Sequence, residues 1–245
     1  MRGEGVQVRV ESPSPLNLMR RLVWNHRKMV LVDPDIMALQ RAFIGGVQPT
    51  AHNAGWHDFA VEMSGDMMNC LAGEFNSTWD KWGTRGVSAY SGGLVVADVP
   101  GHGILYPLTL RLIRRAARQV IIESPYLQGR HLWRELARAA LRDVDVSVIV
   151  PLNNHKQFGT PVGRVLDWAV HNGINVHRFT GTGGMTHARA LLADDWVLFG
   201  SFPFNLLTAG RMGEIAIATP SASLVGQLRS FLADDITSSQ LHVAR

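Results

Sequence analysis

Two short stretches of the chain share one order of charged and apolar positions. In each, a histidine is followed two residues later by a base, then by an aliphatic run and an aspartate; the stretches are residues 26–33 and 187–194. The aliphatic runs favour strands, and on a strand the histidine and the base share one face. A further apolar segment after each stretch ends in a small pair, Gly45-Gly46 and Gly200-Ser201. The pattern predicts a duplicated unit with a cation beside each imidazole.

From residue 94 onward, the chain alternates strand-like and helix-like patterns. We expect strands at 94–97, 120–123, 144–150 and 175–179, and helices at 107–118, 132–141, 162–171 and 221–232. Strands that alternate with helices predict an α/β fold with a parallel-rich sheet and right-handed crossovers.

The earlier part of the chain has fewer such units. We expect strands at 6–10, 41–44 and 56–63, an extended hairpin tip or short helix at 34–40, and a helix at 66–82. The methionine and aromatic stripe of that helix is interpreted as core packing. The polar, glycine-rich stretch 84–93 is the candidate boundary between a first lobe, 1–90, and a second lobe, 91–245. The two lobes are therefore predicted to be unequal repeats, the first of them shortened.

Composition narrows the class of protein. Hydrophobic residues make up 46% of the 245 residues, and the formal net charge is +4. A folded globular protein is expected, and the mild positive balance suits an anionic substrate without identifying one. The single cysteine, Cys70, excludes an internal disulfide and favours a reducing compartment. No apolar stretch is long enough to predict a transmembrane helix, and no cluster has zinc-ligand spacing.

The duplicated histidine predicts phosphate chemistry. If the two copies meet across a pseudo-twofold axis, two imidazoles face one phosphate. One can attack phosphorus to form a phosphohistidine, and the other can protonate the leaving oxygen and then activate water or an alcohol. Lys28 and Arg189 would bind the non-bridging oxygens. Neither a metal nor another cofactor is indicated. The predicted catalytic set is His26, Lys28, Asp33, His187, Arg189 and Asp194.

Each imidazole needs an acceptor that fixes its other nitrogen. Asp58 follows His26, and Glu214 follows His187, each after a return of the chain. We therefore expect Asp58 to orient His26 and Glu214 to orient His187. The motif aspartates, Asp33 and Asp194, lie at the far ends of their strands and are expected to tie down a turn.

At this point the sequence resembles the phospholipase D superfamily, whose hallmark is a duplicated His-x-Lys-x4-Asp motif. Residues 25–33, with Gly45-Gly46 and Trp56-His57-Asp58, are similar to the bacterial cardiolipin synthase branch, which typically shows Trp-Arg-Asp in the last place. Residues 121–126 and 148–151 match further family segments. The resemblance implies a two-lobed α/β/α sandwich of pseudo-twofold repeats, the first incomplete, with one active site between the lobes. It implies His26 as nucleophile and His187 as acid and base, in phosphodiester hydrolysis or phosphatidyl transfer to an alcohol.

The sequence departs from the family pattern around the substrate phosphate. Arg189 stands where the family has lysine, which keeps the charge but changes the shape of the donor. The family often has asparagine two places after the small pair, where this chain has Gln48 and Pro203; Asn205 lies two residues further on. The predicted phosphate-binding set is Lys28, Arg189, Gln48, Ser201 and Asn205.

Two other readings stay open from the sequence. One is a metal-independent nuclease of the same fold, which the arginines permit although no basic stripe carries interleaved aromatics. The other is a catalytically impaired remnant that binds phosphate or membrane surfaces. For the enzyme of lipid metabolism we expect a phospholipid substrate, no nucleic-acid partner and a cytoplasmic location. Peripheral membrane contact and a homo-oligomer remain compatible with the sequence.

Overall fold

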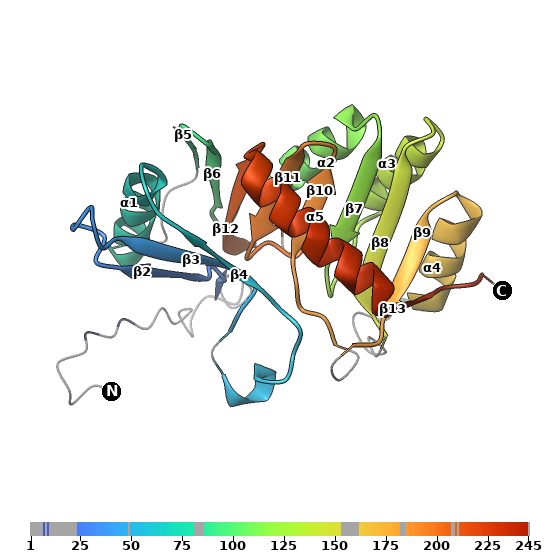
Figure 1. Cartoon of the computed structure of the whole chain (residues 1–245), viewed down its shortest axis with the longest axis horizontal. Helices are drawn as coiled ribbons and strands as arrows, with labels where there is room; N and C mark the ends of the chain where they lie inside the picture. The colour runs from blue at the N-terminus through green and yellow to red at the C-terminus, as the bar shows by residue number, and fades with distance from the viewer. Residues whose placement is uncertain are drawn as a thin grey trace.

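The computed structural model describes residues 7, 9, 24–48, 50–80, 86–152, 162–181, 185–206, 209 and 211–244. Within them, the chain forms a large sheet, flanked by helices, and a small sheet that lies beside one end of it (Figure 1). The strand predicted from Val6, Val8 and Val10 lies outside the described residues. In the described part of the chain, no helix has the length and apolar character needed to cross a membrane.

The large sheet has the strand order β13-β9-β8-β7-β10-β11-β12-β6-β5, and β1 pairs with β12. The bounds are β1 (Trp24–Asn25), β5 (Gly86–Tyr90), β6 (Gly93–Asp98), β7 (Gln119–Glu123), β8 (Asp145–Pro151), β9 (Asn175–Phe179), β10 (Ala190–Ala193), β11 (Trp196–Gly200), β12 (Met212–Thr219) and β13 (Ser239–Leu241). The mixed α/β architecture confirms the predicted fold class. Parallel pairing is confined to β7-β8-β9 and to β1 with β12. The other neighbouring strands pair antiparallel, so the prediction of a parallel-rich sheet is wrong. Short turns such as the one that joins β10 to β11 can connect only antiparallel strands.

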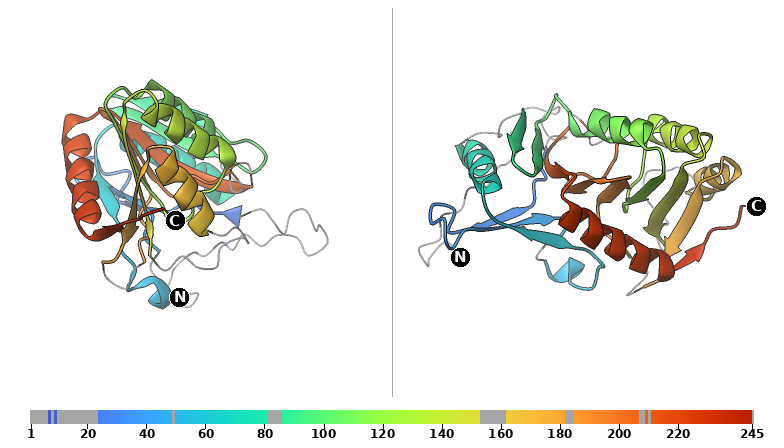
Figure 2. Two further views of the ribbon diagram at one scale, coloured as in Figure 1. Left: turned by 90° about the vertical axis from the view of Figure 1, so that its right-hand side faces the viewer. Right: turned by 45° about the horizontal axis from the view of Figure 1, so that its top comes forward.

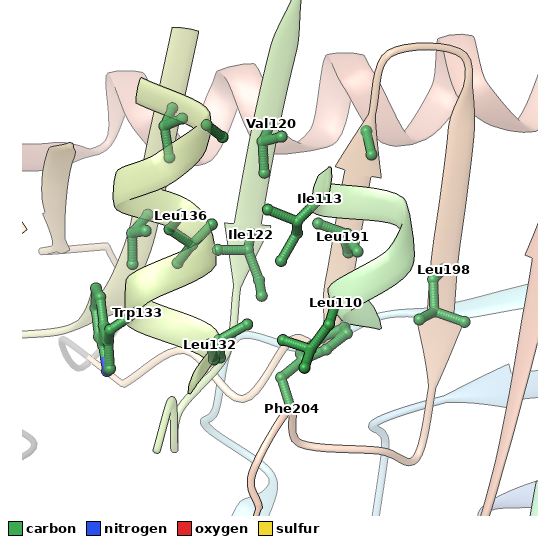
Figure 3. Close-up of a cluster of buried hydrophobic side chains, with 14 of the residues drawn as sticks. Leu110, Ile113, Val120, Ile122, Leu132, Trp133, Leu136, Leu191, Leu198 and Phe204 are labelled. Atoms are coloured by element: carbon green, nitrogen blue, oxygen red, sulfur yellow. The ribbon is translucent and has the colours of Figure 1, made fainter. Parts of the chain in front are cut away.

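Helices cover both faces of the large sheet. On one face lie α2 (Leu105–Arg115), α3 (Arg130–Ala140) and α4 (Val162–His171), and on the other lies α5 (Ala222–Thr237) (Figure 2). Alternate strand residues serve the two faces: Val120 and Ile122 pack under α2 and α3, whereas Ile121 joins the core under α5. Figure 3 shows the first of these cores, with side chains of α2 and α3 meeting those of β7, β10 and β11. Burial on both faces explains why these strands read as continuous apolar runs.

The small sheet has the order β2-β3-β4, with β2 (Met29–Val32), β3 (Arg41–Gly45) and β4 (Ala60–Met63). The 3-10 turn η2 (Ala51–Asn53) precedes β4, and α1 (Met67–Asp80) follows it. Met67, Met68 and Leu71 of α1 are buried in the core that also receives α5, as predicted. Later in the same stripe Phe75 is exposed and stacks on Trp79, so for Phe75 the prediction of core packing is wrong. The residues at 34–40 form turns and no helix.

Two three-stranded units, β2-β3-β4 and β10-β11-β12, have the same pairing register. In the first, Met29 lies three residues after the motif histidine and pairs with Ile44; in the second, Ala190 does so and pairs with Phe199. Both units continue into a third antiparallel strand, β4 or β12. The units differ at the other edge, where β7 pairs with β10, whereas β2 pairs with β3 alone among the described strands. The structure therefore contains the duplication, and the copies are unequal.

Several predicted boundaries differ from the structure. The strand expected from residue 56 begins at Ala60, and the two histidine strands begin at Met29 and Ala190, three residues after the histidines. The stretch 84–93, predicted to separate two lobes, contributes β5, which pairs with β6 inside the large sheet. Neither polarity nor glycine content distinguishes an exposed hairpin from a link between lobes. The division at residue 90 stays a prediction.

Candidate active site

The first motif histidine lies where β1 meets the large sheet. Asn25 pairs with Gly213 of β12, and the backbone N–H of His26 donates to the Gly213 carbonyl at 2.8 Å. This pairing brings His26 beside the next residue of β12, and its Nδ1 lies 2.8 Å from Oε1 of Glu214. The side chain of Glu214 is 1% exposed and that of His26 is 24% exposed. Glu214 thus fixes the first imidazole at Nδ1, and the ring remains partly accessible to solvent.

The second motif histidine is held by the segment before β4. The backbone N–H of His57 donates to Met185 at 3.1 Å, and that of His187 donates to the His57 carbonyl at 2.7 Å. Nδ1 of His187 then lies 2.8 Å from Oδ2 of Asp58, and Oδ1 of Asp58 accepts the N–H of Phe59 at 2.8 Å. The His187 side chain is 5% exposed. This imidazole is fixed and buried.

The predicted orienting pairs are wrong. The sequence predicts that Asp58 orients His26 and that Glu214 orients His187, but each acid contacts the histidine of the other motif. The reason lies in the strand pairings, since β1 joins the second copy through β12 while residues 56–58 lie against residues 185–187. The order of residues along the chain carries no information about such an exchange.

The small pairs give the two acids room. A Cβ on Gly46 would lie 2.4 Å from Oδ1 of Asp58, so the carboxylate can reach His187 only past a glycine. The second copy has Ser201 in the equivalent place, and its hydroxyl donates to the Glu214 carboxylate. Ser201 is predicted to bind substrate phosphate; the structure instead shows its hydroxyl engaged with Glu214.

Lys28 adds a cation whose charge is strongly perturbed. Its Nζ donates to the His26 carbonyl at 3.2 Å. Burial lowers the pKa of Lys28 to about 7, the positive charge of Arg189 acts in the same direction, and Glu214 and Asp58 partly oppose both. Because charges from both copies act on Lys28, the two motifs form one electrostatic unit.

Arg189 is the second cation and is 1% exposed. Its Nη1 donates to the Ser201 carbonyl at 2.9 Å, and its Nη2 lies 2.7 Å from Nε2 of His187. A guanidinium only donates hydrogen bonds, so Nε2 of His187 accepts here and Nδ1 carries the proton that bonds Asp58. Burial lowers the pKa of His187, which the Asp58 hydrogen bond opposes and the charges of Arg189 and Lys28 reinforce. His187 is therefore a neutral imidazole in this arrangement.

The motif aspartates lie at the far ends of their strands. The carboxylate of Asp194 accepts backbone N–H groups of Ala117, Arg118 and Gln119 at 2.8–2.9 Å, which is the turn-anchoring role that the sequence predicts. Burial raises the pKa of Asp194, but these donors outweigh it and the net shift is downward. Asp33 has the same left-handed backbone, with φ 44°, and its carboxylate has no hydrogen-bond partner among the described residues. Neither aspartate adjoins a motif histidine.

The remaining predicted phosphate ligands have different surroundings. Gln48 lines a cavity of ≈ 480 Å³ together with Trp56 and Asp58, and its Oε1 accepts from Asn53 at 2.7 Å. This cavity reaches Asp58, the acid that is bonded to His187. Asn205 is 2% exposed and donates to the Gln128 side chain at 3.2 Å. Asn205 is thus buried and bonded to a neighbouring loop.

Several residues that contact the site have no role predicted from the sequence. The Trp56 ring lies 5.0 Å from the His187 ring, and Tyr126 lies edge-on to His187 at 6.2 Å. Arg27 has a 2% exposed side chain that pairs with Glu74 of α1 at 3.0 Å. The signal was available, since Trp56 and Tyr126 fall in segments with family resemblance and Arg27 stands between the motif histidine and lysine.

The comparisons with known proteins agree with this geometry. The family model described as Cardiolipin synthase, PLD-like domain matches residues 109–236. Cardiolipin synthase A of Pseudomonas putida (strain GB-1) is 30% identical over 238 residues, which cover 86% of this chain and 47% of the relative. Cardiolipin synthase A of Pseudomonas entomophila is 27% identical over 237 residues, with the same coverage. The chain spans about half the length of the curated relatives that it matches.

Solved structures show the same fold. The phosphatidylserine synthase of Haemophilus influenzae superposes with a TM-score of 0.70 at 12% identity, over 91% of this chain and 64% of that chain. The phospholipase D family member Nuc of Salmonella typhimurium gives 0.53 at 17% identity, over 61% of this chain and 99% of that chain. The family model covers more than half of the chain, and the duplicated histidine units lie in one site. The chain therefore belongs to the phospholipase D superfamily, in the family of cardiolipin synthase-like domains.

Proposed function

We propose that the protein catalyses phosphodiester hydrolysis or phosphatidyl transfer on phospholipids through a phosphohistidine intermediate. One observation carries the proposal: two imidazoles, each bound at Nδ1 by a carboxylate of the other repeat, share a site with the cations of Lys28 and Arg189. Fixing Nδ1 on an acceptor leaves the lone pair of Nε2 for chemistry. The phospholipid class is inferred from the cardiolipin synthase relatives.

The two histidines are suited to different roles. Nε2 of His26 has no hydrogen-bond partner among the described residues, and its ring is the more exposed of the two. Nε2 of His187 accepts from Arg189 and is buried. These differences support His26 as the nucleophile and His187 as the acid and base, with Glu214 and Asp58 as the orienting residues of His26 and His187.

The reaction then has two steps. Substrate phosphate first displaces the Arg189 guanidinium from Nε2 of His187, which then takes up a proton from solvent. Nε2 of His26 attacks phosphorus while the bond from phosphorus to the leaving oxygen breaks, and His187 gives that oxygen the proton it has taken up. In the second step water or an alcohol loses a proton to His187 and attacks phosphorus, which breaks the bond to His26. Lys28 and Arg189 stabilise the negative charge on the non-bridging oxygens. Substrate phosphate competes with His187 for the guanidinium, so its binding frees Nε2 of His187.

The test is the covalent intermediate itself. Wild-type protein is mixed briefly with a short-chain phosphatidylglycerol and quenched without acid, because phosphohistidine is acid-labile, and intact masses are measured. We expect a phosphatidyl adduct on the wild type and none on His26→Ala. The matched control is His131→Ala, which removes an exposed histidine at the start of α3 and should leave the adduct unchanged.

Two outcomes would contradict the assignment. An adduct that persists in His26→Ala would move the nucleophile to another residue. Absence of an adduct on the folded wild type, with a DNA or RNA substrate cleaved in EDTA, would favour the nuclease instead. Absence of both activities in a protein that still binds phosphate would identify the impaired remnant.

A further inference from the structure

Behind His187 lies a group of buried titratable side chains that the proposed reaction does not use. Glu123, at the end of β7, is 0% exposed, and Asp235 of α5 is 3% exposed. Nε2 of His57 lies 2.8 Å from Oδ1 and 2.9 Å from Oδ2 of Asp235. The nearest ligand atoms of the three residues lie within 4.8 Å of one another. Buried carboxylates need partners of opposite charge, and among the described residues of this group only His57 can supply one, to Asp235.

The backbone explains why this group sits behind the active site. Residues 56–58 and 185–187 run side by side, and consecutive side chains of extended chain point to opposite sides. Asp58 and His187 meet on the active-site side. His57 and Thr186 therefore point the other way, where His57 bonds Asp235 and the hydroxyl of Thr186 donates to Oε1 of Glu123 at 2.5 Å. Asp235 thus holds residues 56–58 through His57, and Glu123 holds residues 185–187 through Thr186. These two segments carry Asp58 and His187.

The contacts of this cluster imply a proton on one of its carboxyl groups. Oε2 of Glu123 is buried without a hydrogen-bond partner among the described residues. The charges that act on it are those of Asp235 and Asp58, both negative, and the cluster offers no cation except His57, which bonds Asp235. Two adjacent buried carboxyl groups do not both ionise. A proton on Glu123 that is shared with Asp235 would satisfy Oε2 and remove the repulsion.

We propose that Glu123 and Asp235 share one proton and that this carboxyl pair, by holding Thr186 and His57, positions His187 against Asp58. The four side chains are positioning residues, since none reaches the Nε2 atoms at which the reaction occurs. The catalytic consequence rests on the proposed function, whereas the protonation state does not. Burial raises the pKa of Glu123 well above its ordinary value and the charge of Asp235 acts in the same direction, although the Thr186 hydrogen bond opposes both.

A divalent cation bound by His57, Glu123 and Asp235 is the alternative to a shared proton. Zinc binds nitrogen and oxygen at about 2.0–2.2 Å, which places two tetrahedral ligands about 3.3 Å apart. Nε2 of His57 lies 2.8 Å from the nearer Asp235 oxygen, which is a direct hydrogen-bond distance. The geometry therefore favours the proton, and the experiment includes the metal as an outcome.

The protonation state is tested by thermal unfolding of the whole chain between pH 5 and 9. Because the folded-state pKa of Glu123 is raised, its contribution to stability is present below the unfolded pKa and is lost as pH rises toward the folded pKa. Glu123→Gln keeps a neutral donor and acceptor, so its Tm should rise relative to wild type as pH increases. A Tm difference that falls with pH would mean that Glu123 is charged and would overturn the proposal.

The matched control is Glu135→Gln, at another buried glutamate. Glu135 of α3 is 4% exposed but pairs with Arg114 at 3.0 Å and Arg138 at 2.7 Å. The hydrogen bond from Arg114 leads the effects that lower its pKa, so its charged form stabilises the fold above the unfolded pKa. Its substitution should lower Tm relative to wild type at neutral pH, a sign opposite to that expected for Glu123→Gln.

The positioning role is tested on bis(p-nitrophenyl) phosphate as a small phosphodiester. Glu123→Ala should lower kcat about 10²-fold by letting Thr186 move, with KM unchanged, and Glu123→Gln should restore most of it. Loss in both variants would overturn the role of a neutral carboxyl group. If the wild type binds one equivalent of metal and Glu123→Gln does not, a cation and not a proton occupies the cluster, which would overturn the proposal. A wild type without turnover would refute the proposed function, and the Tm series would still decide the protonation state.

Discussion

At the scale of single residues, the two histidines resemble each other in Nδ1 and differ in Nε2. Both Nδ1 atoms lie 2.8 Å from a carboxylate, but only His187 has a guanidinium on its other nitrogen. Arg189 therefore does more than replace a lysine, because it occupies the atom at which His187 would take or give a proton. This difference divides the roles between two chemically identical side chains.

Lys28 predicts a pH limit on substrate capture. Its pKa is lowered to about 7, chiefly by burial, so the free enzyme loses this charge as pH rises through neutrality. Since kcat/KM reports groups of the free enzyme, it should fall above pH ~7. Lys28→Arg keeps its charge and should move this limb to higher pH. The control is Arg41→Gln, at a cation with a 44% exposed side chain, which should leave the limb in place; a limb unmoved by Lys28→Arg would assign it to another group.

The space beside Gly46 is filled by the Asp58 carboxylate, so a side chain at this position should disturb the contact of Asp58 with His187. A Cβ there would lie 2.4 Å from Oδ1 of Asp58, which His187 and the Phe59 N–H hold in place. Gly46→Ala should displace the carboxylate, lowering kcat about 10²-fold and the free energy of unfolding by about 1–3 kcal/mol.

The matched control for Gly46 is Gly73→Ala in α1. A Cβ on Gly73 meets nothing within 4 Å, so this substitution should stabilise the helix by about 0.5–1 kcal/mol and leave turnover unchanged. Equal urea midpoints for the two variants would show that Asp58 tolerates a neighbouring methyl group.

At the scale of elements, the repeated strand units differ in what holds their far ends. In the second unit β10 lies between β7 and β11, and Asp194 receives three backbone N–H groups from the residues before β7. In the first unit β2 has β3 as its neighbour, and Asp33 accepts at its backbone carbonyl from Ile36. The same turn is thus anchored to the sheet in one copy and closed on itself in the other.

This difference predicts unequal effects of one substitution. Asp194→Asn removes the charge that three N–H groups bind and should lower the free energy of unfolding by about 1–2 kcal/mol at pH 7. Asp33→Asn should change it by less than about 0.5 kcal/mol, because asparagine also adopts the left-handed conformation.

Acid should reduce the difference between these variants. The folded-state pKa of Asp194 is lowered, so its stabilisation is present above the unfolded pKa of about 3.9 and is lost as pH falls through the folded value. Urea unfolding of both variants at pH 7 and at pH 3 measures it. Equal losses at pH 7 would contradict the asymmetry of the repeats.

At the scale of the whole molecule, the sequence predicts the mixed α/β class and the elements from residue 94 onward, because apolar runs and amphipathic helices are local signals. Strands β7 and β8 and helix α4 begin within one residue of their predicted starts. The pairing of Glu214 with His26 could not be predicted, because it depends on β1 crossing to β12. The cluster behind His187 was also missed, although a glutamate that ends the run Val120-Ile121-Ile122 signals a buried charge.

Each acid contacts the histidine of the other repeat, so the order of synthesis decides when the site can form. His26 and its acceptor Glu214 are 188 residues apart, and Asp58 and His187 are 129 apart. A ribosome therefore makes His26 long before its acceptor Glu214. Until β12 has been made, the imidazole of His26 lacks the Glu214 carboxylate that fixes its tautomer, so a nascent chain can carry both histidine motifs without this pairing. Synthesis itself delays the formation of this pair until β12 has been made.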